Sequence, residues 1–261
     1  MLLGDGAMDV LVSDELVRTD QAFARNRLLS TFSAEARGLL EPHATVVDLP
    51  LGAIVHSSGE HIVSSYFPFG PTMISLGVEL ADGRTIEVAS IGQEGAVGGI
   101  VSCGHAPAFA HAEVMVPGPA LRIPLTLLEE AKLSSGHIRN LFCRFSDFLL
   151  GQVMHSVACN AFHPIEARAS RWLLTAQDRA GSRIELTQEA LAGLLGAQRT
   201  TVNAVARILQ DEGLISTRRG VIQVMDRVGL KRRSCECYAA VERHFGGVIG
   251  SSGSGGSPDC G

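Results

Sequence analysis

The sequence predicts an α+β fold with three parts in order along the chain: an N-terminal antiparallel β-roll, a long helix, and a C-terminal pair of short helices followed by a basic hairpin. Three observations support this. Short β-branched runs broken by Gly, Pro and Asp fill about residues 43–123, a pattern typical of an antiparallel barrel, sandwich or roll. A helical pattern covers about 124–180, and helices joined by a glycine turn precede a hairpin within 182–245.

Composition limits the class of protein. The chain has 261 residues, of which 46% are hydrophobic and 19% charged. This content excludes a disordered or collagen-like chain, and no apolar run is long enough to span a membrane. Six scattered cysteines give no disulfide framework, and the N-terminus lacks the basic start of a signal peptide. We therefore expect a cytoplasmic protein without a membrane partner.

Charge is distributed unevenly. Residues 1–181 contain 12 basic and 19 acidic residues, whereas residues 182–261 contain 10 and 8. A basic C-terminal third is where a nucleic-acid contact is expected, although a solvated face explains such a difference about as often.

The first elements follow from local signals. Residues 25–41 show a helical pattern, with Ser33 as the N-cap. Within the strand region, the Asp82-Gly83 pair lies between two apolar runs and predicts a hairpin turn.

The long helix carries an apolar seam. Five residues recur at alternating steps of three and four: Ile138, Leu141, Phe145, Phe148 and Gln152. This spacing is typical of a helix that packs lengthwise on a partner, and we expect these residues to form a homodimer interface. The alternative is a helix that lies on its own roll. Pro164 fits the first turn of the next helix, and Gly181 ends that helix.

Residues 186–215 have the pattern of two helices joined by a turn. Thr187 is placed to cap the first helix, Gly196 can adopt the positive φ of the turn, and the second helix begins near Gln198. A hairpin follows, with Arg-Arg-Gly at its tip over residues 218–220. The order of helix, glycine turn, polar helix and basic hairpin disfavours the alternative, an ordinary helical hairpin with solvated charges.

The outer face of the second helix has the chemistry to recognise DNA, because a major groove admits one helix whose N-terminal side chains contact base edges. Base contacts are expected from Arg199, Thr200, Asn203 and Arg207. Phosphate contacts are expected from Thr187, Gln188, Gln198 and Thr201, and from Arg218 and Arg219 in the hairpin.

The segment LTQEALAGLLGAQRTTVNAVARILQDEGLI, followed by RRGVIQV, resembles the winged helix-turn-helix of the Crp/Fnr family of bacterial transcription regulators. The resemblance extends to the helix over 137–160 and the strands over 43–123, which are similar to the family's dimerisation helix and cyclic-nucleotide-binding-like β-roll. The ending SCECYAAVERHF is similar to that of one subgroup. The resemblance implies a homodimeric regulator that binds double-stranded DNA, with RNA polymerase as a further expected partner.

The sequence departs from the family pattern at the recognition helix and in the sensor half. In the family, an Arg-Glu pair and a second Arg one turn later read the bases. Arg199 matches the first Arg, but Thr200 and Ala204 stand at the other two positions. The resemblance therefore implies a different half-site, with Asn203 supplying a contact.

The sensor half departs further. Family members that bind cyclic nucleotides hold the phosphate with Gly-Glu and then Arg-Ser or Arg-Thr, where this chain has Gly98-Gly99 and Phe109-Ala110. No Arg lies between Arg84 and Arg122 to pair with a phosphate. Cyclic AMP control of the usual kind is not expected, no cofactor is predicted, and the effector is left unidentified.

Metal sites are judged from the Cys and His pattern. No Cys precedes Cys103, so the family's N-terminal iron–sulfur cluster is excluded. Five histidines in the roll are possible haem ligands: His43, His56, His61, His105 and His111. Their irregular spacing is more typical of ordinary surface residues. Cys235-x-Cys237 with His244 makes part of a zinc site, but a fourth ligand is not apparent. Packing, or a redox-sensitive thiol pair, is therefore favoured over a metal site.

Two rival classes remain. A cupin-type metal oxygenase requires two His and a carboxylate on one metal, and the sequence has no His-x-His, nucleophile elbow or phosphate-binding glycine loop, so no enzyme is expected. The other rival is a ligand- or redox-sensing module that acts on a protein partner.

The predicted organisation has five segments: a flexible leader over 1–24, a β-roll sensor domain over 25–136, a dimerisation helix over 137–160, a winged helix-turn-helix domain over 161–245 and a flexible tail over 246–261. Such a protein would bind a two-fold symmetric DNA site as a homodimer.

Overall fold

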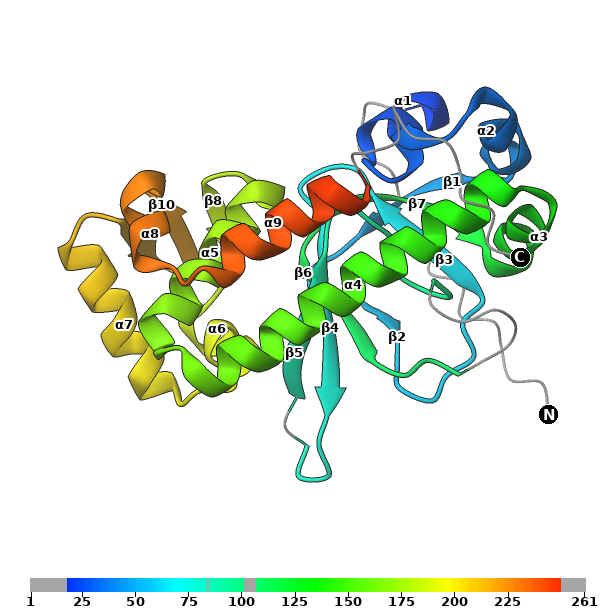
Figure 1. Ribbon diagram of the computed structural model, residues 1–261. Coiled ribbons are helices and arrows are strands. Elements are labelled where there is room, and N and C mark those ends of the chain that lie inside the picture. The colour runs from blue at the N-terminus through cyan, green and yellow to red at the C-terminus, as the bar shows by residue number, and fades with distance from the viewer. Residues whose placement is uncertain (1–17, 84, 101–106, 250–261) are drawn as a thin grey trace.

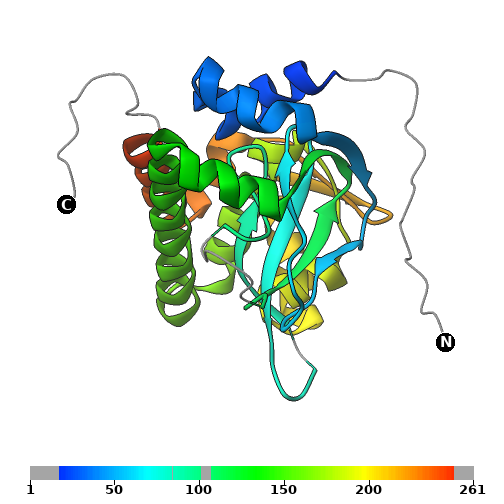
Figure 2. The ribbon, with the colours of Figure 1, turned by 90° about the vertical axis from the view of Figure 1, so that its right-hand side faces the viewer.

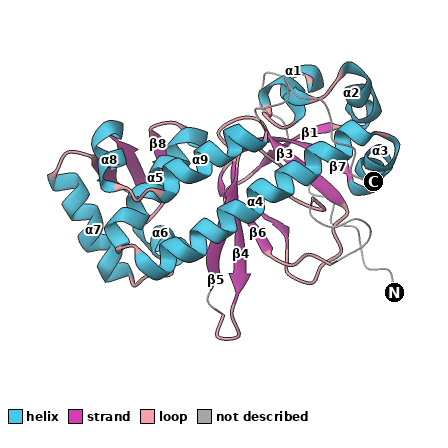
Figure 3. Ribbon diagram, in the orientation of Figure 1, coloured by secondary structure: helices cyan, strands magenta, loops and turns pink. Residues whose placement is uncertain are grey.

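A computed structural model describes residues 18–83, 85–100 and 107–249 (Figure 1). A β-rich half and a mostly helical half are connected by one long helix, α4 (Gly136–Phe162) (Figure 3). The first 17 residues of the predicted leader and the last 12 of the predicted tail lie outside the described residues.

The N-terminal segment is helical from Thr19. Helix α1 (Thr19–Arg25) buries Ala22 and Phe23 in the core of the β-rich half. The predicted flexible leader therefore extends too far, because two adjacent apolar residues anchor a helix too short to show a periodic pattern. Helix α2 (Ala34–Leu40) begins at Ser33, whose side chain accepts a hydrogen bond from the first turn as predicted. Short 3-10 turns lie on either side of it: η1 (Leu29–Thr31) and η2 (Glu41–His43).

The β-roll contains two antiparallel sheets among the described residues. Their strand orders are β1-β7-β3 and β2-β6-β4-β5. The strands are β1 (Thr45–Leu49), β2 (Ile54–His56), β3 (Ser64–Pro68), β4 (Met73–Glu79), β5 (Thr85–Ile91), β6 (His111–Val116) and β7 (Gly118–Pro124). Between β4 and β5, Gly83 has a φ of +79°, so the predicted Asp82-Gly83 turn is confirmed.

Helices α3 (Leu125–Ser134), α4 and α5 (Ile165–Ala180) follow in sequence. Helix α4 runs lengthwise beside the roll (Figure 2). Pro164 immediately precedes α5, and Gly181 ends that helix with a φ of +78°, as predicted. No helix in the described ranges is both long and apolar enough to cross a bilayer.

The predicted dimer seam is the inner face of α4. No side chain in it is more than 5% exposed: Ile138, Leu141, Phe145, Phe148 and Gln152. The Ser90 backbone N–H of β5 donates to Gln152 Oε1 over 2.9 Å, and the Phe145 ring lies so close to Gly95 that a Cβ there would clash with it. Assigning these five residues to a dimer interface is therefore wrong, because the protein's own roll and its C-terminal helix cover them.

The C-terminal half contains a three-stranded sheet in the order β8-β10-β9 and four helices among the described residues. The elements are β8 (Arg183–Glu185), α6 (Gln188–Leu194), α7 (Arg199–Asp211), β9 (Ile215–Arg218), β10 (Val221–Val224), α8 (Arg227–Arg233) and α9 (Cys237–Val248). Helix α9 returns along α4, where the Phe245 and Phe148 rings meet edge to face with centroids 5.0 Å apart. The helix runs past the predicted start of the tail at residue 246.

Helix α5 attaches the C-terminal half to the roll. Trp172 Nε1 donates to Glu87 Oε1 of β5 over 2.9 Å, and burial raises the pKa of the Glu87 carboxyl. Arg179 forms a buried ion pair with Glu94 and donates to Ser90 Oγ over 2.7 Å. These contacts place the two halves against each other instead of leaving a free linker between them.

Candidate nucleic-acid interface

The two helices of the predicted motif are positioned by local signals. Thr187 Oγ1 accepts a hydrogen bond from the Ala190 N–H over 3.0 Å and caps α6. Gly196 has a φ of +59° in the turn, and the Ala197 N–H donates to the Ala192 carbonyl. The predicted cap and turn residue are therefore confirmed.

Helix α7 has one buried and one open face. The inner side chains are no more than 4% exposed: Val202, Val205, Ala206 and Leu209. On the other side, four predicted contact residues are exposed: Arg199, Thr200, Thr201 and Arg207. Helix α7 lies at the end of the molecule opposite the N-terminal helices (Figure 1), so no other described segment covers this face.

The hairpin between β9 and β10 places cations beside these helices. Arg218 pairs with Val221, which leaves a two-residue loop of Arg219 and Gly220. Both have positive φ, +46° and +80°, as the tight hairpin turn that matches strand twist requires. Arg218 and Arg219 are exposed at this tip.

A groove of about 400 Å³ lies between α6, the start of α7 and the hairpin. Five predicted contact residues line it: Thr187, Gln188, Arg199, Arg218 and Arg219. Three guanidinium groups in one groove suit a phosphate, which they can contact with paired N–H donors.

Arg199 also contacts a carboxylate in this groove. Its Nη1 lies 3.0 Å from Glu189 Oε2, and both side chains are more than 60% exposed. An ion pair this exposed contributes little free energy. Arg199 can therefore exchange Glu189 for a base edge or a phosphate at low cost.

Asn203 and Gln198 differ in accessibility. Gln198 is exposed at the start of α7, whereas Asn203 is half-buried and its Oδ1 is buried without a hydrogen-bond partner. The structure thus gives Asn203 less access to a ligand than the sequence suggests.

One groove of the sensor half, formed by described residues within the roll, has no cation in its lining. A groove of about 260 Å³ between β2 and β3 is lined by His56, Glu60 and His61 and by no Lys or Arg. Gly98 has a φ of +97°, and a Cβ on it would meet the Ser64 carbonyl oxygen at 2.5 Å. Close packing explains this glycine. His105 and Cys103 lie outside the described residues.

The cysteines near the C-terminus have partners that the sequence analysis missed. His244 Nε2 lies 3.3 Å from Asp147, whereas Cys235 and Cys237 lie beside Cys159 and His163. His244 therefore does not belong to the group, so the partial zinc site considered with it, over which packing or a redox-sensitive thiol pair was favoured, does not form. A hydrogen bond from Cys235 lowers the pKa of the Cys159 thiol to about 5. The available signal was Cys159-x-x-x-His163, a spacing that places both side chains on one side of a helix end.

Comparisons with known sequences identify the C-terminal region. Residues 167–233 match the family model described as a Crp-like helix-turn-helix domain. Over 71 residues the chain is 35% identical to the HTH-type transcriptional regulator Cmr of Mycobacterium tuberculosis, a match that covers 27% of this chain and 28% of that protein. The match thus spans less than a third of this relative's length.

Solved structures match most of the chain. FixK2 from Bradyrhizobium japonicum superposes with a TM-score of 0.62 at 16% identity, covering 74% of this chain and 98% of that one. TTHB099, a CRP-family transcriptional regulator from Thermus thermophilus, gives 0.61 at 19% identity over 72% and 96%. The c-di-GMP responsive regulator CLP of Xanthomonas campestris gives 0.59 at 18% identity over 74% and 100%. These likenesses establish the fold of both halves.

Proposed function

We propose that this chain, which contains a Crp-like helix-turn-helix domain and has the fold of the Crp/Fnr transcription regulators, is a sequence-specific, DNA-binding transcription regulator. The observation that carries the proposal is the groove in which Arg199, Arg218 and Arg219 converge beside the open face of α7. Helix α7 would enter the major groove, and the hairpin tip would contact the phosphate backbone.

We propose a homodimer formed through the outer face of α4. Exposed residues on this face recur at steps of four and three: Gly136, Asn140, Cys143, Asp147, Leu150, Met154, Val157 and Ala161. From Leu150 onward the seam is apolar, and Leu150, Met154 and Val157 are each more than 50% exposed. A second copy fits this face because two identical helices related by a two-fold axis present matching seams to each other.

The dimer would read a two-fold symmetric site. Two recognition helices on one face of DNA bind half-sites whose centres lie about 34–36 Å apart, which is one helical turn. Gly98-Gly99 and Phe109-Ala110 stand where the family's cyclic-nucleotide binders have Gly-Glu and Arg-Ser or Arg-Thr, which supports control by something other than cyclic AMP.

We also propose where the protein acts and what else it contacts. The protein would act in the cytoplasm, catalyse no reaction, and contact RNA polymerase when bound at a promoter. The competing function is a regulatory module whose C-terminal helices bind a protein instead of DNA. Salt dependence separates the two, because displacement of counterions from DNA makes affinity fall steeply with salt concentration.

Two substitutions test the assigned face. Arg199→Ala is expected to cost about 1–3 kcal/mol at one base position and to relax specificity there. Arg219→Ala should weaken binding to all sequences alike and reduce the salt slope by about one. Fluorescence anisotropy with specific and scrambled duplexes at several salt concentrations measures both effects.

Arg139→Ala is the matched control, since Arg139 is exposed on α4 in the other half of the molecule. It should bind like the parent protein. If Arg199→Ala and Arg219→Ala also bind like the parent, the reading face is assigned to the wrong surface.

A further inference from the structure

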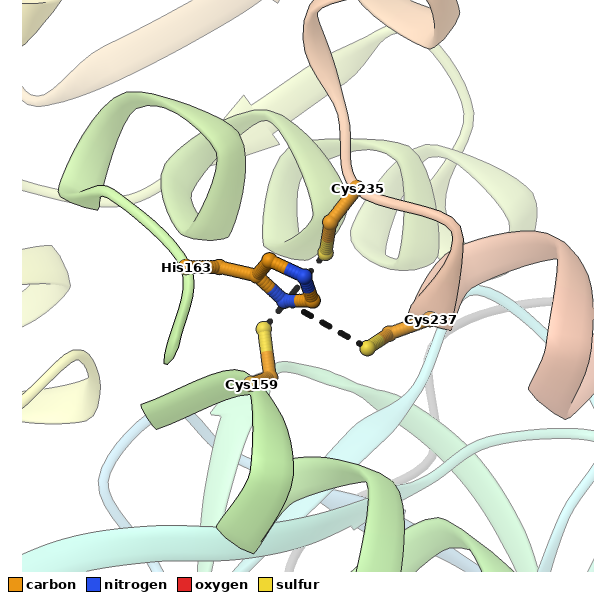
Figure 4. A group of neighbouring side chains, drawn as sticks. All are labelled: Cys159, His163, Cys235 and Cys237. Carbon is orange, nitrogen blue, oxygen red and sulfur yellow. Dashed lines mark hydrogen bonds between the residues drawn. The ribbon is translucent and has the colours of Figure 1, made fainter. Parts of the chain in front are cut away.

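Four potential metal ligands converge at the joint between the two halves (Figure 4). Cys159 lies in the last turn of α4, and His163 lies in the short segment between α4 and α5. Cys235 lies between α8 and α9, and Cys237 is the first residue of α9. Their ligand atoms all lie within 4.8 Å of one another. This is a group of three thiols and one imidazole brought together from two segments of the chain, 159–163 and 235–237.

The distances fit a tetrahedral ion. Cys159 Sγ lies 3.5 Å from Cys235 Sγ, and Cys237 Sγ lies 3.6 Å from His163 Nδ1. With Zn–S of about 2.3 Å and Zn–N of about 2.0–2.1 Å, tetrahedral angles place two sulfurs about 3.8 Å apart and a sulfur and a nitrogen about 3.5 Å apart. The side chains are therefore already close to the separations of a bound site.

His163 is oriented as a metal-binding histidine. Its Nδ1 faces Cys237, while its Nε2 lies 3.2 Å from Glu236 Oε1. A ligating imidazole usually donates its other ring N–H to a carboxylate, which fixes the tautomer and the ring orientation. Glu236 can thus hold the proton on Nε2 and leave the Nδ1 lone pair free for a metal.

The surroundings suit a closed, negatively charged site. The three cysteines are no more than 7% exposed, and His163 is half-buried. Three thiolates and a divalent cation carry a net charge of −1. Arg168 and Arg171 on α5 add positive charge near Cys159, and the Nε atom of each is buried without a hydrogen-bond partner. The guanidinium groups can balance the charge of the loaded site.

We propose that Cys159, His163, Cys235 and Cys237 bind one zinc ion as a structural site. Soft thiolates with one imidazole in tetrahedral geometry favour zinc over the harder cations. Four protein ligands leave no position for substrate, so the ion would stabilise the fold rather than catalyse a reaction.

Because this site lies at the joint between the two halves, a bound ion would affect how the two halves are held together. Zinc would tie the α8–α9 junction to the point where α4 ends and α5 begins. Through α5, that point sets how the helix-turn-helix lies relative to the helix proposed to form the dimer. The bound ion would therefore hold both recognition helices in one pose, and its loss would loosen the joint.

Metal content and cobalt substitution test the site without DNA. The purified protein should contain about one zinc per chain by plasma mass spectrometry. Exchange with Co²⁺ should give the intense visible bands of tetrahedral cobalt and a thiolate-to-cobalt charge-transfer band. Cys237→Ser and His163→Ala should lose the ion or bind it weakly. Cys143→Ser, an exposed cysteine on α4 outside the group, should keep the parent's stoichiometry and spectrum.

A positioning variant adds a readout that general unfolding would not produce. Glu236 is exposed, so Glu236→Gln should fold normally, yet it should lower zinc affinity about 10–100-fold in a chelator competition. If the cysteine variants fail to fold, the parent protein still decides the question. A chelator should lower its melting temperature, and added zinc should restore it.

Several results would overturn the proposal. These are a folded, reduced parent protein that contains no zinc and gives no tetrahedral cobalt spectrum, or an unchanged melting temperature after complete metal removal. Mass spectrometry that finds Cys159 and Cys235 joined as a disulfide in the native protein would do the same. None of these results bears on whether the protein binds DNA, so the two proposals can fail separately.

Discussion

The two long faces of α4 share one spacing and differ in what they contact. The inner face packs Phe145 against Gly95 of the roll and Phe148 against Phe245 of α9. The outer face leaves Leu150, Met154 and Val157 exposed. Both faces repeat at alternating steps of three and four. A heptad-like repeat therefore shows that a helix has a lengthwise partner, but it does not say whether that partner is the same chain or another copy.

Side-chain size separates the two faces better than spacing does. The inner face carries large aromatic and aliphatic groups from Ile138 to Phe148, and Gly95 makes room for the Phe145 ring. The outer face begins with small and polar residues and becomes apolar from Leu150. We therefore expect dimer contacts to centre on the C-terminal half of α4.

The largest expected effect is a loss of stability caused by a substitution at the inner face. Phe145 is fully buried, so Phe145→Ala leaves a cavity in the roll core and should lower the free energy of unfolding by about 3–5 kcal/mol. Urea unfolding followed by circular dichroism measures the change. A loss below about 1 kcal/mol would contradict the packing of α4 on its own roll.

A substitution at the outer face is expected to have a smaller effect, and that effect is on dimerisation instead of stability. Leu150→Glu places a charge in the proposed seam and should weaken dimerisation by about 2–4 kcal/mol with little change in monomer stability. Sedimentation equilibrium measures the dissociation constant. Leu133→Glu is the control, because Leu133 is exposed on α3 outside the seam. Equal dimerisation of both variants would place the interface elsewhere.

The smallest expected effect concerns the polar residue of the inner face. Gln152→Ala removes the acceptor of the buried Ser90 N–H and should cost about 1–3 kcal/mol of stability. Dimerisation should stay unchanged, since Gln152 does not reach the outer face. Thermal melts and sedimentation on the same sample measure stability and dimerisation. A weaker dimer without loss of stability would show that Gln152 belongs to the dimer interface after all.

Local signals in the sequence predicted much of the C-terminal half. A hydroxyl cap at Thr187, a turn glycine at Gly196, a helix-ending glycine at Gly181 and a basic hairpin with its tip at residues 218–220 each depend on a few neighbouring residues. The structure confirms all four. The Crp/Fnr resemblance is also confirmed, by the Crp-like domain match and by the shared fold. The individual DNA contacts stay predictions.

The features that the sequence did not predict depend on contacts between residues that are far apart along the chain. Cys159 and Cys235 are 76 residues apart, and nothing local shows that α9 returns to α4. Cys159-x-x-x-His163 is itself a local signal, but its distance along the chain from Cys235 and Cys237 gave no sign that the two pairs meet. The same reason explains α1, whose two core residues are anchored by strands far along the chain. Periodicity in the sequence identifies the apolar face of a helix, but only the tertiary structure shows what packs against that face.

Selection of random duplex DNA by the purified protein, with no ligand added, tests the central claim most directly. A dimeric regulator predicts enrichment of a two-fold symmetric site with half-site centres about one helical turn apart, and loss of that symmetry with Leu150→Glu. Enrichment of an asymmetric site by the parent protein would contradict the dimer. Failure to enrich any sequence, at low salt and with zinc-loaded protein, would mean that an effector must first align the dimer or that the helix-turn-helix binds another partner, and it would contradict binding of DNA without an effector.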